Sequence, residues 1–293
     1  MAKPIIELIK VLRERTGAGM MDCKKALEEC DCDIEKACDW LREKGIAKAA
    51  KKASRIAAEG LTYVKSCDHC GKAIIIEVNS ETDFVAKSDA FKELVEEVAR
   101  IILHDEIPTV EEAKENAQIK ELFTNATVKI GEKLDLRRFE IVKLNEGEGF
   151  GTYIHMGGKI SVLVVVNKSC DDAKGLAMHI AANNPSYISK EDIPAEVLAH
   201  EKAIQMEAAK TDEKLANKPE AVVEKIIEGK VNKQLAETTL AEQEYLLEPG
   251  CTVGNFLKQR DMKVVRFIRY MVGEGIEKRK DDFAQEVMSQ INN

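Results

Sequence analysis

Residues Ser80–Ser88 read S-E-T-D-F-V-A-K-S, and they lie between an apolar run and an amphipathic segment. The run Ala73–Val78 is rich in β-branched residues and predicts a strand, while apolar residues recur at helical spacing over Phe91–Ile102. Asp83 and Phe84, an acidic residue and an aromatic one, therefore lie side by side at a junction between a strand and a helix.

This stretch contains two candidate helix starts. Ser80 followed three residues later by Asp83 fits a capping box, and Ser88 with the acidic residue after it is a second start. One unbroken helix from Asp83 would put Phe84 within about 20° of Phe91 around the helix axis and make it a core residue. A helix that begins only at Ser88 would instead leave Phe84 in a projecting turn. The pattern leaves both arrangements open.

The composition is that of a globular protein. The chain has 293 residues, of which 44% are hydrophobic and 33% charged, and this length predicts about two domains. The net charge of -8 argues against a protein whose main function is binding nucleic acid or an anionic membrane. The start Met1–Ile5 lacks a signal-peptide core, and no run is long enough for a membrane span. We expect a cytoplasmic protein, unprocessed at its amino terminus, with no membrane partner and no direct nucleic-acid partner.

Eight cysteines raise the question of a metal site. Cys67–Cys70 reads C-D-H-C, but the second CxxC of a strong zinc signature is absent. A zinc enzyme is one alternative, and a hairpin turn in which Gly71 supplies a positive φ is the other. Cys23, Cys30 and Cys38 fall within helical patterns, where cysteine usually packs as a small apolar residue. We expect no metal ion and no cofactor.

The amino-terminal residues 4–44 predict three short helices, with Gly45 as the cap that ends the third. A domain over 1–45 would have the size of ubiquitin-associated domains. Met20 and Met21 stand in the connector between the first two helices. They are either an adaptable contact surface or filling for the small core.

Residues 46–58 are predicted to be a helical linker with a basic face. A solvated face is the ordinary interpretation, and an RNA- or ribosome-associated binding protein is the alternative function that this linker raises. The basic residues, with no acidic residue among them, are Lys44, Lys48, Lys51, Lys52 and Arg55.

Two successive α+β halves are predicted, each a hairpin followed by a helix, which is the pattern of an internal duplication. The fold class is α+β, with a core of two subdomains built on antiparallel sheets. The first subdomain spans 59–145, and the second combines 146–187 with 240–272.

A glycine-rich passage, Gly147–Lys159, opens the second half. It is not a phosphate loop, because Tyr153 stands where that motif needs a glycine and Ile160 where it needs Ser or Thr. We interpret it as a hairpin, in which His155 is more typical of a structural residue than of a catalytic one. The chain is therefore expected neither to be an enzyme nor to bind a nucleotide in a loop of its own.

Two charge-rich helical segments, Pro194–Lys210 and Pro219 to about Ala236, predict an antiparallel helical hairpin within 188–239. Such an arm cannot bury both of its apolar stripes in a large core, so it offers a surface to another chain. Residues 273–293 are predicted to form a final amphipathic helix after two glycines, with a stripe of Phe283, Val287 and Ile291.

Three ordered motifs resemble the signatures of the bacterial elongation factor Ts family. They are LRERTGAGMMDCKKAL at 12–27, TDFVAK at 82–87 and FIRYMVGEGIEK at 267–278. The resemblance extends from end to end of the chain. The Cys67–Gly71 turn and the abundance of cysteine depart from the family pattern.

The resemblance implies a translation elongation factor that exchanges guanine nucleotides on elongation factor Tu. It implies that a tip carrying Asp83 and Phe84 enters the partner beside its nucleotide and magnesium, which favours the projecting turn for Phe84. It also implies that 188–239 is a coiled-coil dimerisation module, although homodimerisation and a free arm both stay open. The partner-binding residues carried over from the family are Thr82, Asp83, Phe84, Val85, His155, Met20 and Met21.

Overall fold

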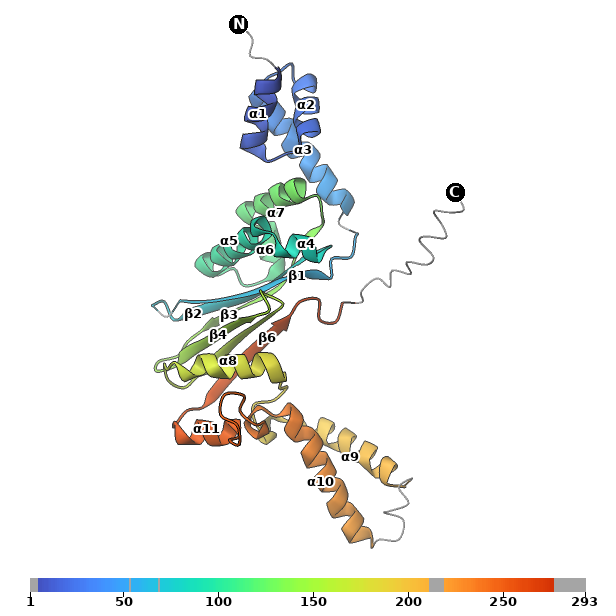
Figure 1. The fold of residues 1–293 in the computed structure, drawn as a ribbon, viewed down its shortest axis with the longest axis vertical. Coiled ribbons are helices and arrows are strands. Elements are labelled where there is room, and N and C mark those ends of the chain that lie inside the picture. Colours follow the sequence, from blue (N-terminus) through green and yellow to red (C-terminus); the bar gives the residue numbers. More distant parts are fainter. Residues whose placement is uncertain (1–4, 53, 68, 211–218, 277–293) are drawn as a thin grey trace.

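The computed structural model describes residues 5–52, 54–67, 69–210 and 219–276 (Figure 1). Phe283, Val287 and Ile291, the stripe of the predicted final helix, lie outside the described residues. A helical bundle lies at one end of the molecule, two sheets and their helices form the middle, and a helical arm projects at the other end. The fold is α+β, as the sequence predicted.

The bundle consists of α1 (Ile5–Thr16), α2 (Met20–Glu29) and α3 (Ile34–Lys52), which enclose a small apolar core. The prediction that Gly45 ends the third helix is wrong, because α3 runs through it and takes in part of the predicted linker. A Cβ atom on Gly45 would lie 2.5 Å from the Cγ2 atom of Val128, which lies in α7 (Ala117–Ile130). The glycine therefore allows α3 to approach α7 closely.

The two sheets are antiparallel and three-stranded. In the first, the order is β1 (Glu59–Cys67), β2 (Lys72–Ser80) and β3 (Leu134–Lys143). In the second, the order is β4 (Gly149–His155), β5 (Ile160–Val166) and β6 (Val264–Met271). Both predicted hairpins, at β1–β2 and β4–β5, are confirmed, and Gly71 in the first turn has a φ of +60°.

The central strands β2 and β5 are each buried on both faces, which explains their nearly continuous apolar sequences. Ile74 and Ile76 of β2 pack with the helices above the first sheet, whereas Ile75 points toward the second sheet. In β5, Val164 packs with the helices below, whereas Leu163 points toward the first sheet. The core is therefore layered as helices, sheet, sheet and helices (Figure 1).

The helices above the first sheet are α4 (Asp83–Lys87), α5 (Asp89–Asp105), α6 (Val110–Glu115) and α7; those below the second are α8 (Asp172–Asn183) and α11 (Val253–Gln259). The sequence predicted one helix from Val110 to about Ile130, but Asn116 divides it. Its side chain accepts hydrogen bonds from the backbone N–H groups of Gln118 and Ile119, so it caps a new helix.

The arm consists of α9 (Ala195–Lys210) and α10 (Glu220–Thr238), which run side by side (Figure 1). Short turns, η1 (Lys190–Asp192) and η2 (Leu240–Glu242), join it to the core. The apolar residues between its helices include Ile227, Val231 and Leu235, all nearly buried. Among the described residues of the arm, the large apolar side chains that stay exposed are Leu198, Ile204, Met206 and Val222. No helix of the described residues is both long enough and apolar enough to cross a bilayer.

Candidate functional site

The junction between β2 and α5 is built from two helix caps. Thr82 has an extended backbone, and its hydroxyl accepts a hydrogen bond of 3.4 Å from the N–H of Val85, which begins the single turn α4. Ser88 is extended as well, and its hydroxyl accepts from the N–H of Phe91 at 3.3 Å, which begins α5. The chain therefore has two helix starts in this stretch, at Thr82 and Ser88, and the predicted cap at Ser80 is wrong.

The break at Ser88 decides where the two phenylalanines point. Phe84 is 81% exposed, whereas Phe91, in the first turn of α5, is completely buried. Ala86 and Val85 hold the other side of the short helix against the core of the first half. The projecting turn for Phe84 is thus the arrangement found, and α4 presents one aromatic side chain to solvent.

A residue far along the chain fixes the base of this tip. Glu132 accepts a hydrogen bond of 2.7 Å from the hydroxyl of Thr82 and one of 3.0 Å from its backbone N–H. Sequence reasoning missed Glu132, since no local pattern connects it to a cap that lies 50 positions away. The carboxylate holds Thr82 in the extended conformation from which α4 starts.

Asp83, next to Phe84, is held as a carboxylate. A hydrogen bond of 2.6 Å from the ammonium of Lys87 lowers the pKa of Asp83, and the positive charge of Lys159 lowers it further. Lys159 also forms an ion pair of 2.6 Å with Glu59 at the start of β1. The tip and the end of the β4–β5 hairpin are therefore electrostatic neighbours.

The hairpin turn that contains His155 is docked on the first sheet. The carbonyl of Gly158 accepts hydrogen bonds from the N–H and the hydroxyl of Thr62 in β1, at 2.7 and 2.9 Å. His155 is half-buried at the end of β4, with its Nδ1 atom 3.2 Å from the hydroxyl of Tyr153. Since α4 also packs on β1, the structure brings the His155 turn and the Phe84 tip to one end of the core.

Met20 and Met21 lie in the first turn of α2, so the prediction that they stand in the connector before it is wrong. Their exposed fractions are 59% and 74%, so the alternative that they fill the small core is wrong. They belong to the amino-terminal bundle rather than to the group formed by the tip and the hairpin turn.

The described part of the third motif is anchored by a buried carboxylate. Glu77 of β2 is fully buried and accepts a hydrogen bond of 2.8 Å from the N–H of Gly273. Its oxygens also pair with the guanidinium groups of Arg137 and Arg138 at 2.9 and 2.6 Å. An acidic residue inside an apolar strand was the available signal for this anchor, and sequence reasoning overlooked it.

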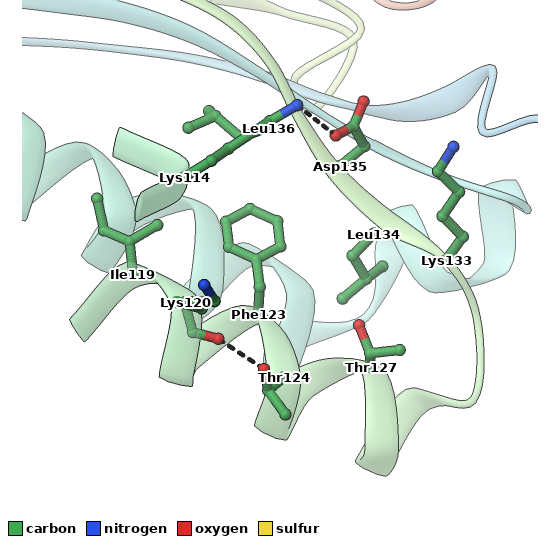
Figure 2. A pocket seen from close by; sticks show the side chains of 10 residues that line it. All are labelled: Lys114, Ile119, Lys120, Phe123, Thr124, Thr127, Lys133, Leu134, Asp135 and Leu136. Atoms are coloured by element: carbon green, nitrogen blue, oxygen red, sulfur yellow. Dashed lines mark hydrogen bonds and ion pairs between the residues drawn. The ribbon is translucent and has the colours of Figure 1, made fainter. Parts of the chain in front are cut away.

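Metal sites and cavities were the other candidates in the part of the chain that the structure describes. Within the described residues, no group of three or more His, Cys, Asp or Glu side chains is arranged to hold a metal ion. A groove of about 310 Å³ lies between α7 and β3. Phe123 and Leu134 face each other across it (Figure 2). Lys114 at its edge is paired with Asp135 at 2.8 Å. The groove has apolar and charged residues in its lining, and none of them belongs to the tip.

A comparison with known protein families finds a match over the part of the chain that contains these features. The model described as "Elongation factor TS" matches residues 81–274, which is more than half of the chain. The match begins at Glu81, directly before the cap of α4, and it covers the tip, the His155 turn, the second sheet, the arm and Gly273. The chain therefore belongs to the elongation factor TS family, whose function is nucleotide exchange on elongation factor Tu.

Proposed function

We propose that the chain accelerates release of GDP from elongation factor Tu by inserting the tip formed by Asp83 and Phe84 beside the bound nucleotide and its magnesium ion. GTP then reloads the emptied partner, and we expect this to take place in the cytoplasm. The observation that carries the proposal is the 81% exposure of Phe84 on a helix whose start and end are both fixed by caps.

An exposed phenylalanine on a rigid turn is suited to act as a wedge. An aromatic side chain can bury roughly 150–250 Å² on binding, worth about 25 cal/mol for each Å². The hydrogen bonds that cap α4 are already present in the free chain, so little conformational entropy is lost when the tip docks. Most of the binding free energy gained by burying Phe84 is therefore available to displace elements of the partner.

The wedge would act through the metal site of the partner. GDP is held largely by backbone amides around its phosphates and by magnesium, so shifting the elements around the metal removes a large electrostatic attraction. This mechanism needs no covalent chemistry from the chain. Val85 and Thr82 keep Phe84 in place, while His155 contacts the partner from the neighbouring turn.

Exchange requires that nucleotide and exchange factor weaken each other's binding. Because coupling is reciprocal, the chain must bind nucleotide-free elongation factor Tu more tightly than the GDP-bound form. A typical coupling of about 1–3 kcal/mol changes affinity roughly 5- to 150-fold. An effective exchange factor is expected at or beyond the upper end of that range.

The remaining modules supply contacts away from the nucleotide. In this proposal the bundle 1–45 grips the outside of the GTPase domain with Met20 and Met21. The exposed apolar side chains of the arm, such as Ile204 and Val222, support homodimerisation through 188–239. Sedimentation of the full chain at increasing concentration tests that dimer.

The RNA-binding alternative has no described observation in its favour. Of the linker's basic residues, Lys44 lies over the ring of Trp40, and Lys52 donates to the carbonyl of Gly131. Arg55 pairs with Glu81 at 3.2 Å. These three side chains are engaged within the chain itself.

The decisive experiment is the release of fluorescent GDP from elongation factor Tu at substoichiometric amounts of the chain. Wild type is expected to accelerate release catalytically, and Phe84→Ala to lose most of that acceleration while it stays folded. Leu246→Ala, which truncates another exposed apolar residue, on the segment between η2 and α11, is the matched control and is expected to behave as wild type. No acceleration by wild type would reject exchange, and equal acceleration by Phe84→Ala would reject the wedge.

A further inference from the structure

The turn after His155 has an unusual residue in its first central position. Met156 and Gly157 have φ angles of +50° and +63°, and the N–H of Gly158 donates to the carbonyl of His155 at 3.1 Å. Two central residues with positive φ and this hydrogen bond define a type I′ turn, which favours Asn, Asp or Gly in both positions. Methionine there carries backbone strain that glycine would not.

Other residues with positive φ in the described chain have local explanations. Asp31, Asn184 and Asp261 are of the types that tolerate this conformation. Cys32, with a φ of +63°, lies in the turn that ends α2, where its N–H donates to the carbonyl of Leu27 at 2.8 Å. Glu106 ends α5, and its carboxylate is paired with lysines on β2 and β3. Met156 combines the strained conformation with a large apolar side chain that is 70% exposed. Its side chain therefore does not compensate for the strain by packing in the core.

Met156 lies at the same end of the core as Phe84. The turn is docked on β1 through Gly158. Lys159, the next residue, lies close enough to Asp83 for its positive charge to lower the pKa of that carboxyl group. Ile154, two residues before Met156, is also partly exposed, at 39%. The charge of Lys159 is already paired with Glu59 at 2.6 Å, so Lys159 does not place an unpaired cation beside this turn.

We propose that Met156 is a second apolar contact with the GTPase partner, beside the one made by Phe84. Its thioether packs on an apolar patch of the partner that borders the opening entered by Phe84. The backbone strain at Met156 is not offset by contacts in the free chain, and contacts of its side chain in the complex would offset it. Methionine suits this role because its unbranched, polarizable side chain adapts to an irregular surface. The inference rests on the proposed function and adds a contact residue to it.

The test uses substitutions that separate stability from binding. Met156→Gly removes the side chain and also relieves the backbone, so it is expected to keep or raise the melting temperature. Affinity for nucleotide-free elongation factor Tu is expected to fall roughly five- to tenfold, as for a typical interface contact. Met156→Asn, which also suits the turn, should lose affinity in the same way. Met156→Leu, which keeps the apolar bulk, should stay within about twofold of wild type.

Asp261→Gly is the matched control, because Asp261 has a φ of +47° and lies after α11, far along the chain from the turn. It should keep or raise the melting temperature and leave affinity unchanged. Wild-type affinity in Met156→Gly would overturn the inference while the proposed function stands. A change in self-association without a change in affinity would overturn it in favour of a contact between copies. If wild type itself fails to bind elongation factor Tu, the proposed function and the inference both fall.

Discussion

The two halves of the core are built alike and differ in one connection. Each has a hairpin whose second strand, β2 or β5, lies at the centre of a three-stranded sheet and is followed by a helix on the outer face. From β2 the chain reaches α5 through Glu81–Ser88, which folds into the tip. From β5 it reaches α8 through Asn167–Asp171, which carries no large exposed apolar side chain at any of its five described positions.

The difference between the two connections distinguishes residues that build the core from residues that form the binding tip. The second half shows that a strand and a helix of this kind can be joined without a projecting turn. Ala86 of the short helix α4 packs in the core, whereas its exposed Phe84 contributes nothing to the core. What the first connection adds is a surface feature, on an element whose base is rigidly held.

The largest contrast is expected between two phenylalanines seven residues apart. Phe91→Ala should lower the free energy of unfolding by about 3–5 kcal/mol, because Phe91 is fully buried and its removal leaves a cavity. Phe84→Ala should change it by less than about 0.5 kcal/mol, as for other exposed positions. Urea denaturation of both variants measures this. A large destabilisation by Phe84→Ala would show that the tip belongs to the scaffold after all.

A second prediction tests whether both halves depend on close packing of their first strands. A Cβ atom at Gly151 of β4 would lie 2.2 Å from the carbonyl oxygen of Ala173, and one at Gly60 of β1 would lie 2.2 Å from that of Val78. Each Gly→Ala change is expected to lower the free energy of unfolding by about 1–3 kcal/mol or more through overpacking. At Gly60, whose φ is +139°, backbone strain adds to this loss.

Gly229→Ala in α10 is the control for these two changes, since an added Cβ there meets nothing within 4 Å. It should stabilise the chain by roughly 0.5–1 kcal/mol, because alanine is the better helix residue. Thermal denaturation of the three variants gives the ranking. If only one of the two strand glycines proves sensitive, the halves are alike in topology but not in packing.

The likeness of the halves was predictable from local patterns, and their joining was not. The apolar run at β2 and the helical spacing after Phe91 are signals within a few residues of each other, so the strand, the helix and the hairpins were predicted. Gly45 was assigned as a helix end because glycine is common there, but its actual requirement is the approach of Val128 from α7. Contacts of that kind lie beyond any local pattern.

The candidate site shows the same limit. The sequence presented Ser80 and Ser88 as helix starts, whereas the structure has one at Thr82 and one at Ser88. Thr82 is held by Glu132 from a distant loop. The family resemblance favoured the projecting turn, whereas the residues alone left it open. The sequence also could not show that the tip and the His155 turn lie close together. They do so because Gly158 of one half is docked on Thr62 of the other.

A third, smaller contrast concerns the helix caps of the two connections. Thr82→Ala should lower the free energy of unfolding by about 1 kcal/mol, since the hydroxyl both caps α4 and donates to Glu132. Asp171, at the start of α8, makes no side-chain cap hydrogen bond. Asp171→Ala should therefore change stability by less than about 0.5 kcal/mol. Equal effects on the unfolding midpoint would contradict the view that the first connection is specifically fixed.

The smallest effect expected is a difference in how the halves respond to acid. His179 in the second half is fully buried, and burial lowers its pKa below the usual value near 6.5. The unfolded chain then binds more protons than the folded one as soon as the pH falls below about 6.5, so the second half loses stability from there down toward the folded pKa. In the first half, hydrogen bonds from Lys143 and Lys72 lower the pKa of Glu106 to about 2.

The stabilisation from Glu106 is complete above about pH 4.5 and is lost only as the pH falls from there through 2. Between about pH 6.5 and 5 only the second half should therefore loosen. Hydrogen exchange, corrected for the intrinsic rate at each pH, should show faster exchange in α8 and little change in α5. His179→Gln, which removes the titrating ring, should abolish that difference. Equal loosening of both helices in wild type would mean that acid acts on the core as one unit, and that the halves share their stability although they do not share a tip.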